Sequence, residues 1–245
     1  MRKRITVVGA ITVFLVIAAG AGAWGMSLRA NPFAFDPGDT ELVQSGWIDG
    51  IGCPTNASIF DGTSSTPYTD PACPTGDRRD DSNEGLLLAK TGPTANVASA
   101  GVVIRHVRGT LTELGYDIRK PDSSADPRGS HCGAGAPRFN ITAEDGSTYF
   151  LGCNSPPATT QTVGNGWLRL RWGGTTPLLA FNASGALVDI TSVRVRRLSI
   201  VFDEGQDTGP DNFGLAVLDN IDVNGKLVGQ GRSPESGNED DNDRR

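Results

Sequence analysis

Several residue types that build helices are scarce in this chain of 245 residues. Glutamate occurs only 7 times beside 21 aspartates, with 4 lysines, 4 glutamines and 2 methionines. Because these side chains favour helices, their scarcity argues against a helical bundle or a coiled coil. There are also only two histidines, His106 and His131, and no G-x-S-x-G motif. The sequence therefore contains no recognisable nucleophilic triad.

Turn residues and short apolar runs are what the chain has in abundance. It has 32 glycines and 15 prolines, and these separate short stretches rich in Val, Ile, Leu and aromatic residues. Such runs predict strands. They cover Val97–Val107, Thr110–Ile118, Arg138–Thr142, Thr148–Cys153, Trp167–Trp172, Leu178–Phe181, Val193–Phe202 and Phe213–Val223.

Two hairpins and one alternating strand can be identified within this pattern. Asp145-Gly146 and Asn224-Gly225 are typical of tight turns that need a positive φ. In residues 167–172 polar and apolar side chains alternate, which is typical of a strand with one solvent-facing side. The sequence thus predicts an all-β protein, a two-layer antiparallel β-sandwich of jelly-roll type, with an N-terminal signal or anchor helix.

The first 23 residues have the pattern of a targeting segment. Arg2, Lys3 and Arg4 precede an apolar run that ends in small residues, and no further charge occurs before Arg29. Cleavage as a signal peptide is favoured, with an uncleaved anchor as the alternative. In either case we expect the chain to be exported, either secreted or held on the outer face of the cytoplasmic membrane, with membrane contact only through an uncleaved segment.

Cysteine usage agrees with export to an oxidising compartment. The four cysteines, Cys53, Cys73, Cys132 and Cys153, are an even number and predict disulfides. Three pairings are possible, and the shorter loops favour Cys53–Cys73 and Cys132–Cys153. A zinc site is not indicated, because close ligand pairs of the C-x-x-C kind are missing.

Composition divides the exported part into three segments. Residues 24–84 are rich in proline and predict an irregular, disulfide-stapled lead-in. Residues 85–228 hold most of the predicted strands and form the expected β-sandwich. Residues 229–245 are polar and acidic and are expected to be a disordered tail.

Charge is distributed unevenly along the chain. The net charge is −6, yet residues 97–200 hold 11 basic residues against 7 acidic ones. Nucleic acid is not expected as a partner, because phosphate neutralisation needs a dominant basic surface.

An acidic, glycine-rich loop follows the run that ends at Phe202. Asp203, Asp207 and Asp211 recur every four residues, and clustered carboxylates are suitable ligands for Ca²⁺. The loop is not an EF-hand, since Thr208 and Gly214 stand where that motif needs glycine and glutamate. A solvated acidic loop with Asx-turns is the alternative.

The closing strand Gly214-Leu-Ala-Val-Leu-Asp-Asn-Ile-Asp-Val resembles the last strand of galactose-binding-like jelly-roll domains and carbohydrate-binding modules. Residues 109–152 are also similar to the core of exported bacterial proteins, and the resemblance covers about residues 85–228. It implies that Asp219 helps to hold a structural Ca²⁺.

Trp167, Arg169 and Arg171 are the best candidates for a glycan-binding face, because indole rings stack on sugars and guanidinium groups donate to hydroxyls or carboxylates. The alternative is an inter-sheet tryptophan beside surface arginines.

The same strand predicts that Asp219 is buried. By alternation its side chain shares a face with Leu215, Val217 and Ile221. A buried carboxylate needs a metal or another partner. Besides calcium, the sequence offers an ion pair with an arginine of the preceding strand, namely Arg194, Arg196 or Arg197.

The function predicted from these observations is a non-catalytic exported module that binds a glycan. The alternatives are a structural surface protein without a small ligand and a jelly-roll glycan hydrolase or lyase. Glycan hydrolysis needs paired carboxylates. The candidates Glu113, Glu144 and Glu204 show no recognisable spacing.

Overall fold

A computed structural model describes the β-sheet part of the chain. The described residues are 28–53, 57–60, 65–68, 84–91, 94–120, 137–153, 155–156, 159–162, 167–203 and 213–229. The predicted signal or anchor segment and nearly all of the predicted tail lie outside these ranges. Within them, no helix has the length and apolar character needed to cross a membrane.

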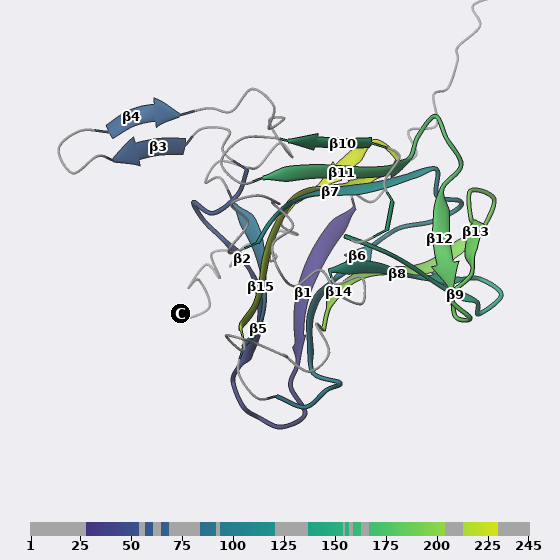
Figure 1. The fold of residues 1–245 in the computed structure, drawn as a ribbon, viewed down its shortest axis with the longest axis horizontal. Coiled ribbons are helices and arrows are strands. Elements are labelled where there is room, and N and C mark those ends of the chain that lie inside the picture. Colours follow the sequence, from purple (N-terminus) through teal and green to yellow (C-terminus); the bar gives the residue numbers. More distant parts are fainter. Residues whose placement is uncertain are drawn as a thin grey trace, which may run out of the picture.

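The first of two large sheets has the strand order β1-β6-β14-β8-β9-β12-β13, with every pair antiparallel. Figure 1 shows β1 beside β6, with β12 and β13 at the far end of the sheet. Its strands are β1 (Arg29–Phe35), β6 (Ser99–Arg105), β8 (Arg138–Ala143), β9 (Thr148–Gly152), β12 (Leu179–Asn182), β13 (Leu187–Asp189) and β14 (Val195–Phe202).

The second sheet has the order β10-β11-β7-β15-β5-β2, with β16 paired to β15, and it too is antiparallel. Its strands are β2 (Val43–Ile48), β5 (Gly85–Thr91), β7 (Glu113–Arg119), β10 (Thr159–Thr162), β11 (Leu168–Gly173), β15 (Phe213–Val223) and β16 (Lys226–Val228). A separate two-stranded sheet pairs β3 (Ala57–Phe60) with β4 (Ser65–Tyr68).

The hydrophobic core lies between the two large sheets, which meet where β1 packs on β2 and where β6 and β14 pack on β5. Its aromatic centre is formed by Tyr116 of β7, Phe139 of β8 and Trp172 of β11. The ring of Tyr116 lies 5.2 Å from that of Trp172 and 5.6 Å from that of Phe139. The Tyr116 hydroxyl donates to the Pro137 carbonyl at 2.8 Å, so this polar group is satisfied inside the core.

The predicted all-β, two-layer antiparallel sandwich is confirmed. Both predicted hairpins form: β8 pairs with β9 across Gly146 (φ 89°), and β15 pairs with β16 across Asn224 (φ 56°) and Gly225 (φ 74°). Two consecutive positive φ values are the signature of the type I′ turn, which matches the twist of the flanking strands.

The sandwich begins earlier in the chain than the sequence predicted. Residues 24–84 were expected to be an irregular lead-in, but β1 and β2 lie within this segment and form an edge of each large sheet. The sequence did not predict β1, because Pro32 lies within it and proline usually interrupts a strand. An edge strand tolerates proline, since the missing N–H can lie on its unpaired side.

Candidate functional site

The predicted glycan-binding face of β11 is largely occupied by protein contacts. Leu170 and Trp172 point into the core, as alternation predicts. On the opposite face Trp167 is only 1% exposed and packs with Cys53 and Val217. Its indole therefore does not present a ring to solvent.

Arg169 of this face forms an ion pair with Asp117, which lies directly opposite on β7. Its Nε donates to Asp117 Oδ1 at 2.8 Å and its Nη2 donates to Oδ2 at 2.7 Å. The carboxylate is fully buried, and Asn220 Nδ2 also donates to it, at 3.0 Å. This bidentate geometry is the strongest form of an arginine–carboxylate contact.

Arg171 lies between two carboxylates on the same face. Its Nη1 is 3.4 Å from Asp117 Oδ1 and its Nε is 3.5 Å from Asp222 Oδ2. Burial lowers the pKa of Arg171, which the charges of Asp117 and Asp222 oppose. Burial also raises the pKa of Asp222, against the influence of Arg171.

Glycine at position 115 makes room for this network. Gly115 lies opposite Arg171 in the ladder, and a Cβ there would overlap Arg171 Cδ and the Leu170 carbonyl. Arg171 can therefore cross β7 only because residue 115 has no side chain. The ion pairs of Arg169 and Arg171 thus connect β11 to β7 and β15.

That this face of β11 binds a glycan stays a prediction. The contacts of Trp167, Arg169 and Arg171 with the protein itself do not favour it.

Asp219 is buried, at 6% exposure, as the sequence predicted, but for a different reason. The β15–β7 register shifts between Asp219 and Asp222, and Asn220 has a φ of 45°. Such a bulge reverses the alternation. Ile221 therefore joins the core, whereas Asp219 accepts hydrogen bonds from the backbone N–H groups of Cys53 and Asn220, both at 2.6 Å.

The predicted calcium ligands are only partly described. Asp203 pairs with Arg138, whose Nη1 and Nη2 lie 2.7 and 2.5 Å from its carboxylate oxygens. Burial alone would raise the pKa of Asp203, but the hydrogen bonds and charge of Arg138, with Lys90 nearby, hold it below its ordinary value. Asp207 and Asp211 lie outside the described residues, among which no group of three or more His, Cys, Asp or Glu side chains is placed to hold a metal. Calcium binding stays a prediction.

Two of the four cysteines, Cys53 and Cys153, lie among the described residues, and that they form disulfides stays a prediction. Cys73 and Cys132 lie outside the described residues, so the predicted connectivity stays a prediction. Cys53 is fully buried, and its backbone N–H binds Asp219. Cys53 thus lies over the outer face of β15, which explains the burial of Trp167 and Asp219.

A hollow at the end of β6 and the start of β14 forms a second candidate site, which we call the arginine groove. It has a volume of about 900 Å³ and is lined by residues 103–109, Glu144 and residues 194–198. The loop after β6 closes onto β14 through the hydrogen bond from Val195 N to Gly109 O, at 2.8 Å. Positive φ values at His106 (65°) and Gly109 (80°) let the chain make this tight return.

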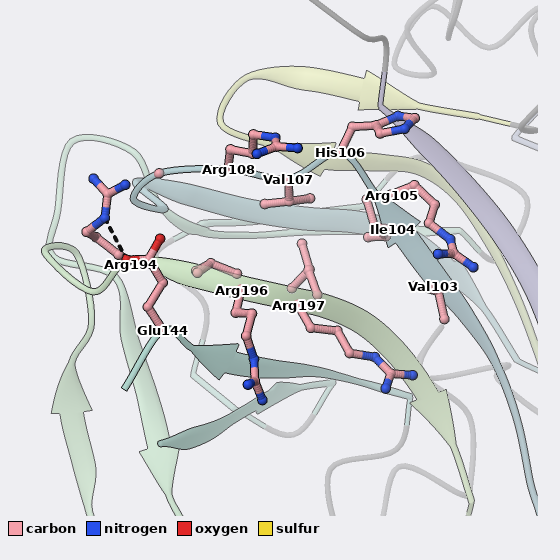
Figure 2. A pocket seen from close by; sticks show the side chains of 13 residues that line it. Val103, Ile104, Arg105, His106, Val107, Arg108, Glu144, Arg194, Arg196 and Arg197 are labelled. Carbon is pink, nitrogen blue, oxygen red and sulfur yellow. Dashed lines mark hydrogen bonds and ion pairs between the residues drawn. The ribbon is translucent and has the colours of Figure 1, made fainter. Parts of the chain in front are cut away.

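A bulge explains why consecutive arginines face the groove. Val195 pairs with Ala143 and Arg197 pairs with Thr142, so β14 has one residue more than β8 at this point. Arg196 and Arg197 are both exposed as a result, between the buried Val195 and Leu198. Figure 2 shows the two side chains next to each other on β14.

Charge in the arginine groove is strongly positive. Among the lining residues that the structure describes, Glu144 is the single carboxylate, and its Oε2 accepts from Arg194 Nε at 2.9 Å (Figure 2). Among the described residues, no carboxylate pairs with the four other arginines of the lining, Arg105, Arg108, Arg196 and Arg197.

Sequence reasoning did not identify this site. It noted the basic middle of the chain and considered Arg194, Arg196 and Arg197 only as partners of Asp219. The available signal was the Arg196-Arg197 pair inside an apolar strand, because two polar residues in succession break the alternation and point to a bulge.

Comparisons with known proteins assign the chain to no family. No family model matches the chain, and no curated protein sequence matches it significantly. Among solved structures, the chain is similar to a family 11 carbohydrate-binding module from Clostridium thermocellum, in complex with a β-1,3-1,4-mixed-linked tetrasaccharide. The identity is 13%, the match covers 82% of this chain and 99% of that chain, and the TM-score is 0.31.

Proposed function

We propose that the chain is an exported, non-catalytic β-sandwich module that binds a glycan through the arginine groove. The observation that carries the proposal is an open hollow of about 900 Å³ lined by arginines, four of which have no carboxylate partner among the described residues. Each guanidinium presents several N–H donors in a fixed plane, and glycans offer hydroxyl and acid oxygens as acceptors. The predicted targeting segment supports export.

The lining of the groove supports binding without turnover. Hydrolysis of a glycosidic bond usually needs two carboxylic groups on opposite sides of the bond. The described part of the groove offers Glu144 alone, and Arg194 holds it in an ion pair. A structural surface protein without a ligand is the second candidate, in which the exposed arginines would simply be solvated.

Retention on a panel of immobilised polysaccharides tests the proposal. We expect the chain to bind at least one glycan and to release no sugar from it. The double variant Arg196→Ala/Arg197→Ala should weaken this binding by tenfold or more. Arg119→Ala is the matched control, because Arg119 is exposed on the other sheet.

Three other outcomes would contradict the proposal or part of it. Binding that the double variant retains in full would place the site elsewhere on the molecule. Failure to bind any glycan would refute glycan binding and favour the structural role. Released sugar would refute the non-catalytic assignment. Far-ultraviolet circular dichroism confirms that the variants are folded.

A further inference from the structure

We infer that the arginine groove selects glycans that carry anionic groups, and that Arg29 of β1 extends the site. The chemistry shared by such ligands is a carboxylate, sulfate or phosphate oxygen pair that a guanidinium can bind in its plane. This inference rests on the proposed glycan-binding function and specifies its ligand class.

The first support is the separation of charge within the molecule. The chain is acidic overall, with a net charge of −6. Elsewhere in the described part of the chain, several arginines are paired with carboxylates. Arg138 is paired with Asp203, and Arg169 with Asp117. The described lining of the groove instead gathers five arginines beside one glutamate. A hollow lined by one sign of charge concentrates counter-ions of the other sign.

The second support is a pair of adjacent positive charges, which by itself lowers the stability of the folded sheet. Arg29 and Arg105 are direct partners in the β1–β6 ladder, and both are exposed. Equal charges placed opposite each other on neighbouring strands destabilise a sheet. Arg105 also lines the groove, so the row of positive charge continues from β14 through β6 to β1. An anion bound along this row would relieve the repulsion.

The third support is what the groove lining lacks. No Phe, Tyr or Trp side chain is among the lining residues that the structure describes, whereas stacking on such rings is how proteins hold the apolar faces of neutral sugars. Trp167, the tryptophan expected to have this role, is buried on the other sheet. Recognition in the groove must therefore depend on hydrogen bonds and charge.

Other anionic partners fit the surface less well. A membrane or protein interface needs apolar anchors beside the charges. In the described part of the chain the large exposed apolar side chains lie outside the groove, at Phe35, Ile48, Val97, Leu179 and Leu187. Nucleic acid is disfavoured by the acidic remainder of the chain.

Pairs of glycans with one backbone and different charge test the inference. We expect polygalacturonate to bind at least tenfold more tightly than its fully methyl-esterified form, and dextran sulfate more tightly than dextran. Because Debye screening acts on exposed charges, raising NaCl from 50 to 500 mM should weaken binding by tenfold or more. Titration calorimetry of the full chain provides both measurements.

Variants of the arginines test whether the groove and Arg29 cause the preference for acidic glycans. Arg29→Gln and the double variant Arg196→Gln/Arg197→Gln should each weaken binding of the acidic glycans and make its salt dependence shallower. Arg119→Gln, on the other sheet, should change neither. These positions are exposed, so the variants are expected to fold. The melting temperature should not fall in any of them, and it should rise slightly in Arg29→Gln, because that change removes the repulsion with Arg105.

Equal affinity for charged and neutral members of each pair, without salt dependence, would overturn the inference and leave glycan binding standing. Failure to bind any glycan would refute the proposed function itself. Tighter binding to duplex DNA or to vesicles of anionic lipid than to the acidic glycans would overturn the glycan assignment in favour of that partner.

Discussion

Asp117→Asn is the substitution whose effect the structure defines best. The Asp117 carboxylate is fully buried, and both of its arginine partners have side chains less than one fifth exposed. Asparagine keeps the volume but removes the charge, and it turns an N–H₂ group toward a guanidinium that also only donates. Arg169 and Arg171 would thus lose the carboxylate that offsets their burial.

The expected magnitude follows from this burial. Removing one partner of a buried ion pair costs about 3–5 kcal/mol. Because asparagine retains one acceptor oxygen and the arginines keep some contact with water, we expect about 3 kcal/mol, at the lower end of that range. With a urea m-value of about 2 kcal/mol/M, the unfolding midpoint should fall by about 1.5 M.

Urea unfolding of wild type and variant at pH 7 measures this shift, with Glu144→Gln as the control. The Arg194–Glu144 pair has a similar Nε–Oε2 distance, 2.9 Å, but the side chain of Arg194 is 64% exposed and that of Glu144 is 52% exposed. An exposed pair contributes about 0–1 kcal/mol, so the control midpoint should fall by less than about 0.5 M. Equal shifts for the two variants would refute the argument that burial makes the Asp117 pair important.

Two further predictions concern stability. Gly115→Ala should lower the free energy of unfolding by about 1–3 kcal/mol, because the new Cβ overlaps Arg171. Gly46→Ala, where a Cβ meets no atom within 4 Å, should leave the melting temperature nearly unchanged, and a similar loss in both variants would contradict the steric argument. The pKa of Asp203 lies below its ordinary value of 3.8, so its contribution to stability is present above that value and is lost as the pH falls through the folded pKa. Urea titrations between pH 5 and pH 2 should therefore show a shallower loss of stability in Asp203→Asn than in wild type, and identical slopes would contradict this.

Local sequence determined the features that depend on a few neighbouring residues. The Asn224-Gly225 turn forms as predicted because few residues other than glycine and asparagine readily adopt consecutive positive φ values. Residues 168–172 alternate between core and outer face because the period of a strand is two. Scarcity of helix-forming residues, with many short β-branched runs, was enough to predict the all-β sandwich.

The candidate site depended on contacts that no local pattern contains. The arginine groove joins the loop after β6 to the start of β14 and to Glu144, which are brought together only by the strand order of the first sheet. The bulges at Arg196 and Asn220 decide which side chains face outward, and a bulge depends on the partner strand as much as on its own residues.

The sequence by itself therefore determined the fold class, the turns and the need of Asp219 for a partner, because these follow from backbone geometry and from the cost of burying a charge. Tertiary structure decided that Trp167 is covered, that Arg169 meets Asp117, and that the arginines of β14 face solvent together. The physical reason is that exposure and pairing are properties of surfaces built from distant segments, and sheet register, which sets them, is fixed only when the strands assemble.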